Sequence, residues 1–246
     1  MNILKLFADY PFFPSFLDSG KEIRDIVYDS RKAKPGTIFV AMRGASHDGH
    51  ESCMDAYERG CRDFVVEHRV PLPNDAITYL VADSRRALSV MSRSLFELDP
   101  KTESQLGATH CIAVTGTKGK TSTCMILKSI FEAAGRKVGY IGTLGVMYDG
   151  KTIETPNTTP ESYEIFRYLR EMRLSGCEYV LIEASSQGVK MHRTADLFFD
   201  LGIFTNLSPD HIGPGEHESF EEYLACKREL FFQCALSIGN VDDEYY

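Results

Sequence analysis

The residues with the clearest chemical potential form the sequence Gly-Thr-Lys-Gly-Lys-Thr-Ser at positions 116–122. The apolar run Cys111–Val114 before them predicts a buried strand, and a segment of helical periodicity follows them. A strand, a glycine turn and a helix N-terminus together direct backbone N–H groups and a helix dipole at one point, which suits a phosphate. The Lys120 amine can reach terminal phosphate oxygens, and the Thr121 hydroxyl can bind Mg²⁺. The pattern predicts a nucleoside triphosphate site, with a glycine turn that binds nothing as the alternative.

Two further side chains follow predicted strands. The run Tyr179–Glu183 predicts a buried strand that ends in a carboxylate. In nucleotide-binding sheets, an acid at such a strand tip helps to hold the metal that bridges phosphates. A helix cap or a surface carboxylate is the alternative for Glu183. The next strand, predicted at 201–205, leads to His211, which the same topology brings towards Glu183, although a lone loop histidine is more often only a polar loop residue.

A lysine interrupts the apolar stripe of the helix predicted from about Ser219. The stripe has the spacing i, i+3, i+4, i+10, i+11 and i+14, and its members are Phe220, Tyr223, Leu224, Leu230, Phe231 and Cys234. Lys227 occupies position i+7, where burial would lower its pKa. A partly neutral Lys227 could capture carbon dioxide as a carbamate, which is a metal-binding anion. The pattern alone favours the other interpretation, a stem that packs while the ammonium reaches water.

Alternating strands and helices must position these residues. The polar segment 99–109 divides the chain, so we predict an N-terminal domain at residues 1–104 and a second domain at 105–246. Strands are predicted at 37–42, 63–67, 77–83, 111–115, 137–141, 179–183 and 201–205, and helices at 52–59, 84–98 and 121–134. This alternation predicts an α/β fold with mainly parallel sheets, in which ligands bind beyond the carboxyl ends of the strands.

Composition excludes several classes of protein. The 246 residues are 43% hydrophobic, 25% charged and carry a formal net charge of −8, which argues against nonspecific attraction to nucleic acid or an anionic membrane. No apolar stretch approaches the ~20 residues needed to cross a bilayer, and no signal peptide is visible in Met1–Tyr10. The seven cysteines form no C-x-x-C pair and are expected to be reduced. We therefore expect a cytoplasmic protein.

The ordered motifs resemble the Mur ligases, the ATP-dependent amide-forming enzymes of peptidoglycan precursor synthesis. The resemblance covers nearly the whole chain and is closest to the UDP-N-acetylmuramoyl-tripeptide synthetase branch, which adds the third amino acid. The motifs are Asp29–Arg31, Pro35–Gly36, Ile38–Ala41, the glycine turn, Asn157–Pro160, Glu183–Ser186, Arg193, Thr205–Ser208, Asp210–His211, Lys227, and Asn240 with Asp242 and Asp243. The six-residue G-x-x-G-K-T turn, shorter than a standard P-loop, is the family's own form. Departures are Lys118 in place of the commonest Asn, Gln187 in place of a frequent His, and the loop 209–217.

The resemblance implies roles for individual residues. ATP would lie against Gly116, Thr117, Lys118, Gly119, Lys120, Thr121 and Ser122. One Mg²⁺ would be held by Thr121 and Glu183, and a second by Glu183, His211 and a carbamate on Lys227, so that the catalytic residues are Lys120, Glu183, His211 and Lys227. The uridine diphosphate end of the substrate would contact Ser30, Ser46 and His47. The muramoyl dipeptide would contact Asn157, Thr158, Thr159, Ser185 and Arg193.

The implied reaction adds a diamino acid to UDP-MurNAc-L-Ala-D-Glu through an acyl phosphate. The diamino acid stays open between L-lysine and meso-diaminopimelate, with a small preference for L-lysine from the turn 116–120 and from Ser208–His211. The resemblance also implies a monomer, an incomplete ATP-binding domain, an absent C-terminal amino-acid-binding domain and no ligation by residues 1–246 alone. Two alternatives remain: another amide ligase of the folylpolyglutamate or cyanophycin synthetase type, or a non-catalytic module that binds nucleotide or precursor.

Overall fold

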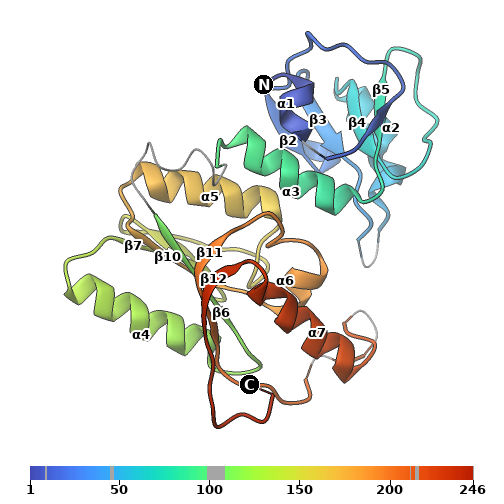
Figure 1. Cartoon of the computed structure of the whole chain (residues 1–246). Coiled ribbons are helices and arrows are strands. Elements are labelled where there is room, and N and C mark those ends of the chain that lie inside the picture. Colours follow the sequence, from blue (N-terminus) through green and yellow to red (C-terminus); the bar gives the residue numbers. More distant parts are fainter. Residues whose placement is uncertain (9, 45–46, 99–108, 211, 214–215, 246) are drawn as a thin grey trace. The chain divides into compact units, whose positions relative to one another are not determined.

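The computed structural model describes residues 1–8, 10–44, 47–98, 109–210, 212–213 and 216–245. They form two compact units, Met1–Glu97 and Leu98–Tyr246 (Figure 1). The predicted domain boundary between residues 104 and 105 lies outside the described residues. Each unit is built on its own sheet of mainly parallel strands, so the predicted α/β class is confirmed.

The first unit contains a five-stranded sheet in the order β1-β5-β4-β3-β2. Strands β2 to β5 run parallel to their neighbours, and the short β1 pairs antiparallel with β5. The strands are β1 (Phe13–Pro14), β2 (Asp25–Val27), β3 (Thr37–Val40), β4 (Asp63–Val66) and β5 (Ile77–Leu80). The helices are α1 (Ile3–Phe7), α2 (Cys53–Glu58), α3 (Ser84–Leu95) and the 3₁₀ turns η1 (Ser30–Lys32) and η2 (Gly49–Ser52).

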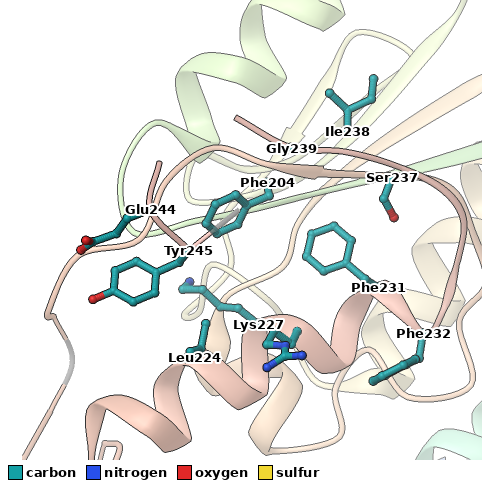
Figure 2. Close-up of a pocket in the computed structure, with 11 residues that line it drawn as sticks. Phe204, Leu224, Lys227, Phe231, Phe232, Ser237, Ile238, Gly239, Glu244 and Tyr245 are labelled. Carbon is teal, nitrogen blue, oxygen red and sulfur yellow. The ribbon is translucent and has the colours of Figure 1, made fainter. Parts of the chain in front are cut away.

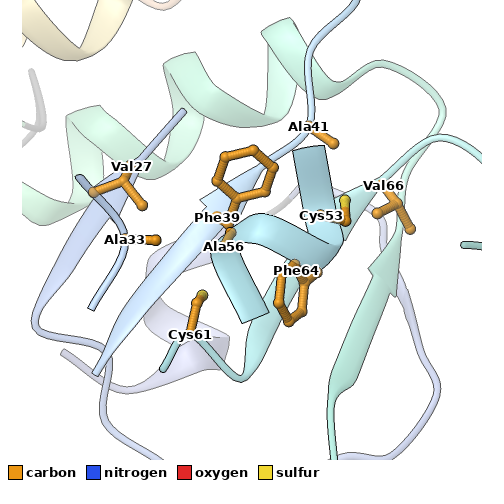
Figure 3. Packing of buried hydrophobic residues seen from close by; sticks show 9 residues of the cluster. All are labelled: Val27, Ala33, Phe39, Ala41, Cys53, Ala56, Cys61, Phe64 and Val66. Atoms are coloured by element: carbon orange, nitrogen blue, oxygen red, sulfur yellow. The ribbon is translucent and has the colours of Figure 1, made fainter. Parts of the chain in front are cut away.

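The core of the first unit explains why its inner strands are apolar throughout. Every residue of β3 and β4 is buried, because both strands have neighbours on each side and are covered on their faces. Phe39 and Phe64 meet edge to face, with ring centroids 6.2 Å apart. Small side chains from α2, including Cys53 and Ala56, fill the space beside these rings (Figure 3).

The second unit contains a seven-stranded sheet in the order β12-β11-β6-β10-β7-β8-β9. The first five strands of that order are parallel, and β8 and β9 continue the sheet as an antiparallel hairpin. The strands are β6 (His110–Thr115), β7 (Val138–Gly142), β8 (Gly145–Tyr148), β9 (Lys151–Ile153), β10 (Tyr179–Glu183), β11 (Phe199–Phe204) and β12 (Cys234–Ile238). The helices are α4 (Lys120–Ala133), α5 (Ser162–Leu174), α6 (Ser186–Lys190) and α7 (Phe220–Phe231).

Helices cover both faces of this sheet (Figure 1). Alternate residues of the strands, among them Tyr140 and Leu181, pack with the side chains of α4. The intervening Gly139 lies against Met172 of α5 on the opposite face. The strand register sets Glu183 beside Val114. The carboxyl ends of β6, β7, β10 and β11 therefore share one edge of the sheet.

Sequence periodicity described this unit incompletely. It predicted β10 with the observed bounds but missed α5, α6 and the hairpin of β8 and β9. In α4, Ile130 is exposed, because the inner face of this helix is centred on Cys124 and Leu127. Cys234 was predicted to extend the stripe of α7, which ends at Phe231, and it instead begins β12.

The helices of the described residues are short. The two longest among them, α4 and α5, contain 14 and 13 residues. A helix that spans a bilayer needs ~20 predominantly apolar residues. In the part of the chain that the structure describes, no helix has the length and apolar character to cross a membrane.

Candidate nucleotide and precursor site

The glycine turn joins the end of β6 to the start of α4. Gly116 has a φ of +149°, and a Cβ there would overlap the Thr205 hydroxyl, so only glycine fits. Gly119 has a φ of +86° and is the N-cap of α4. The turn is held against the end of β11, because the Thr117 N–H donates to the Asn206 carbonyl at 2.8 Å. The first N–H groups of α4 are thus presented at the carboxyl edge of the sheet, where an anion can bind.

Two lysines of this turn have different surroundings. The Lys120 amine donates to the carbonyls of Gly116 at 2.8 Å and Thr117 at 3.1 Å. Burial lowers the pKa of Lys120, although the charge of Glu183 opposes that effect. Lys118 is largely exposed and pairs with Asp210 at 2.9 Å. Lys120 is therefore the partly buried lysine of the turn, and Lys118 is the exposed one.

Glu183 ends β10 with a fully buried side chain. Its carboxylate accepts hydrogen bonds from the hydroxyls of Thr121 and Thr143, both at 3.0 Å, and from the Thr143 N–H at 3.2 Å. The Tyr140 hydroxyl donates to the same carboxylate, and burial, then that bond, raises the pKa of Tyr140. These donors compensate a charge that would be costly to bury alone.

The donor set fits one Mg²⁺. The Thr121 hydroxyl and the Glu183 carboxylate are adjacent oxygen ligands, which hard cations prefer, and both face the space beyond the glycine turn. Among the described residues, no three His, Cys, Asp or Glu side chains are grouped so as to hold a metal by themselves. The predicted second site depends on His211, which lies outside the described residues.

The predicted precursor-binding residues of the second unit lie close to Glu183. The Thr159 hydroxyl donates to the Glu183 carbonyl at 2.8 Å and accepts from the Ser185 N–H at 3.0 Å. The Ser185 hydroxyl accepts from the Gly188 N–H and so caps α6. Arg193 forms an ion pair with Glu161 at 3.0 Å and donates a hydrogen bond to the Thr159 carbonyl.

These groups line one pocket of about 470 Å³ at the carboxyl edge of the sheet. It brings together nearly all the predicted site residues of the second unit, namely Thr117, Lys118, Gly119, Lys120, Thr121, Ser122, Asn157, Thr158, Thr159, Glu183, Ser185 and Arg193. Thr143, Gln187 and Glu216 also line it. Except for Gly119, the residues that line the pocket have polar side chains, so the pocket suits a charged ligand.

Lys227 lies under the glycine turn. Its side chain is 2% exposed, and its amine donates to the Gly116 carbonyl at 2.9 Å and lies 4.5 Å from the centre of the Tyr223 ring. The interpretation in which the ammonium reaches water is therefore wrong. Burial, and then the charge of Lys120, lower the pKa of Lys227 to about 7. Lys227 also lines a second pocket, of about 680 Å³, towards Phe204 (Figure 2).

The remaining predicted residues belong to the first unit. Ser30 begins η1 and hydrogen-bonds the Asp55 carboxylate. The His47 ring bonds the Ser52 hydroxyl at 2.8 Å. Ser46 lies outside the described residues. The structure describes Ser30 and His47 within their own unit, so their predicted contact with the uridine diphosphate stays a prediction.

Sequence reasoning missed Tyr140 and Thr143, which contact Glu183 from the end of β7. The available signal was that the strand predicted at 137–141 ends at the same edge of the sheet as β10. Tyr140 itself resembles any other buried aromatic residue in an apolar run. Nothing in its local pattern indicates that its hydroxyl meets a carboxylate.

Comparison with known proteins agrees with this geometry. Residues 114–246 match the Mur ligase middle domain, which covers more than half of the chain. The chain belongs to the Mur ligase family. A curated relative, the UDP-N-acetylmuramoyl-L-alanyl-D-glutamate--2,6-diaminopimelate ligase of Clostridium perfringens, is 38% identical over 224 residues, which are 91% of this chain and 45% of the relative. The homologous ligase of Clostridium botulinum is 35% identical, over 100% of this chain and 49% of its own.

Solved structures of Mur ligases have the same fold. A UDP-N-acetylmuramoyl-L-alanyl-D-glutamate--2,6-diaminopimelate ligase superposes with a TM-score of 0.82 at 22% identity, covering 100% of this chain and 48% of that one. At that identity the likeness concerns the fold alone. This Mur ligase chain spans about half the length of the curated relatives that it matches.

Proposed function

We propose that the protein is an ATP-dependent carbon–nitrogen ligase that adds a diamino acid to UDP-MurNAc-L-Ala-D-Glu in peptidoglycan precursor synthesis. The observation that carries this proposal is the 470 Å³ pocket, in which the glycine turn, Glu183 and Arg193 converge. The names of the curated relatives support the same reaction and favour 2,6-diaminopimelate over L-lysine as the added amino acid. They also favour this reaction over the folylpolyglutamate or cyanophycin synthetase type.

In the proposed reaction, the precursor carboxylate attacks the γ-phosphate of ATP and displaces ADP, which gives an acyl phosphate. The amine of the diamino acid then attacks the acyl carbon, displaces phosphate and loses a proton. The chief obstacle is repulsion between two anions. The first N–H groups of α4 and the Lys120 amine would offset the phosphate charge. Mg²⁺, held by Thr121 and Glu183, would supply further positive charge. The protein adds orientation, because both anions are confined to one pocket.

Lys227 has the properties that a carbamate requires. An amine with a pKa of about 7 is substantially neutral at neutral pH, and the neutral amine is the form that reacts with carbon dioxide. Its contact with the Gly116 carbonyl places it directly beneath the phosphate turn. We therefore propose that a carbamate on Lys227 binds a second Mg²⁺, together with Glu183 and His211.

The residues proposed to bind the precursor form two groups. Its dipeptide would contact Thr158, Thr159, Ser185 and Arg193, and its uridine diphosphate would contact Ser30, Ser46 and His47 of the first unit. In this proposal the first unit is the precursor-binding domain and the second is the ATP-binding domain. The structure describes all seven cysteines, and none of them is in a disulfide; we propose a cytoplasmic location.

The test is ATP-dependent ligation by the complete gene product, with meso-diaminopimelate and L-lysine compared. Phosphate release should require both the dipeptide precursor and the diamino acid. Lys120→Ala should lower kcat/KM by about 10²-fold, because the negative charge of the transition state loses a neighbouring cation. Binding of ATP and precursor without turnover would instead support a non-catalytic binding module, and a folate substrate would support the other ligase type.

A further inference from the structure

The two oxygens of the Glu183 carboxylate have different partners. Oε1 accepts from the Tyr140 hydroxyl and from the Thr143 N–H at 3.2 Å. Oε2 accepts from the hydroxyls of Thr121 and Thr143, both at 3.0 Å. One oxygen therefore contacts a buried tyrosine and a backbone group, and the other contacts two threonine hydroxyls that line the 470 Å³ pocket.

The hydrogen-bond donors of the two Glu183 oxygens differ in how easily a cation could replace them. The hydroxyls of Thr121 and Thr143 can rotate, and their oxygens can then face a ligand in the pocket. Tyr140 is 0% exposed, and its ring packs in the core beside α4. The Tyr140 oxygen accepts the Leu144 N–H at 3.3 Å, so its single proton is directed at Glu183. The bond to Oε1 is thus held by packing, whereas the bonds to Oε2 are exchangeable.

The backbone near Tyr140 leaves room for this contact. Gly142 is the last residue of β7 and lies beside the Glu183 carboxylate. A Cβ at position 142 would overlap both the Tyr140 hydroxyl and Oε1 of Glu183. Any side chain at position 142 would push the tyrosine and the carboxylate apart. Glycine is therefore required here by close approach and not by its φ, which lies outside the left-handed region.

We propose that Tyr140 is a positioning residue, which fixes Oε1 of Glu183 so that Oε2 is presented to a divalent cation in the pocket. The inference rests on the proposed function, because it assumes that the pocket binds a metal–nucleotide complex. Tyr140 touches neither nucleotide nor cation in this arrangement. It acts by removing the rotational freedom of the carboxylate, as the outer partners of metal ligands do.

The test is Tyr140→Phe in residues 1–246, which keeps the ring in the core and removes only the hydroxyl. The readouts are Mn²⁺ binding in the presence of ATP, from the electron paramagnetic resonance signal of free Mn²⁺, and ATP affinity in EDTA. We expect Mn²⁺ affinity to fall roughly tenfold, as for other lost partners of metal ligands, while ATP affinity in EDTA stays unchanged. Gly142→Ala should have the same effect.

The chain supplies a matched control. Tyr148 on β8 is also buried, and its hydroxyl donates to the Glu171 carboxylate; neither residue lines the 470 Å³ pocket. Tyr148→Phe should leave Mn²⁺ affinity unchanged. The inference is overturned if Tyr140→Phe binds Mn²⁺ as the wild type does, or if ATP affinity in EDTA falls by the same factor. If the wild type itself shows no ATP-dependent Mn²⁺ binding, the proposed function fails instead, and the inference fails with it.

Discussion

Replacing Lys227 by methionine should stabilise the protein at neutral pH and do so less at alkaline pH. Lys227 is buried, and its pKa is lowered from 10.5 to about 7 in the folded state. At a pH between 7 and 10.5, the Lys227 amine is protonated in the unfolded chain and largely neutral in the folded chain. Stability therefore rises with pH in this range. The cost of charging the buried amine is fully present below pH 7 and is relieved as the pH rises towards 10.5.

The size of the effect follows from the shift in pKa. Each pKa unit corresponds to about 1.4 kcal/mol, so the full cost is about 5 kcal/mol at low pH, about 4 at pH 7 and about 2 at pH 9. Methionine loses the hydrogen bond to the Gly116 carbonyl, which offsets about 1 kcal/mol of the gain. The variant should thus be more stable by about 3 kcal/mol at pH 7 and about 1 kcal/mol at pH 9.

The assay is urea unfolding followed by circular dichroism at pH 7 and pH 9, in buffers free of carbon dioxide. Lys151→Met on β9 is the control, because Lys151 is exposed and its removal should change stability equally at both pH values. The reasoning is refuted if the free-energy difference between Lys227→Met and the wild type is the same at pH 7 and pH 9. That result would mean that Lys227 stays charged in the folded protein throughout this range.

Two further substitutions test the nucleotide turn and the first unit. Gly116→Ala should abolish ATP binding, because a Cβ at a φ of +149° would overlap the Thr205 hydroxyl; calorimetric titration that found unchanged affinity would contradict this. Ser30→Ala should weaken binding of UDP-MurNAc-L-Ala-D-Glu by roughly tenfold, the equivalent of one lost hydrogen bond, while ATP affinity is kept. Ser129→Ala on the exposed side of α4 is the control for Ser30→Ala, and equal precursor affinity in both variants would reject the role of Ser30.

Local patterns in the sequence determined the parts of this chain whose structure depends mainly on neighbouring residues. The glycine turn could be predicted because Gly116 and Gly119 allow backbone conformations that other residues avoid. Strand β10 could be predicted because the four apolar residues Tyr179–Ile182 are followed directly by a carboxylate. The alternation of strands and helices predicted a parallel sheet. The parallel sheet in turn predicted that Lys120 and Glu183 lie at the same edge.

Other contacts at that edge were decided by the tertiary structure alone. Strand order places β10 between β6 and β7, and this order brings Tyr140 to Glu183. Lys227 reaches the Gly116 carbonyl across 111 positions of sequence, and its depth of burial settled whether its amine meets water. A local sequence pattern indicates whether a segment prefers to form a helix or a strand. The contacts of Tyr140 and Lys227 depend instead on the order of the strands and the packing of the segments, so they are seen only in the folded chain.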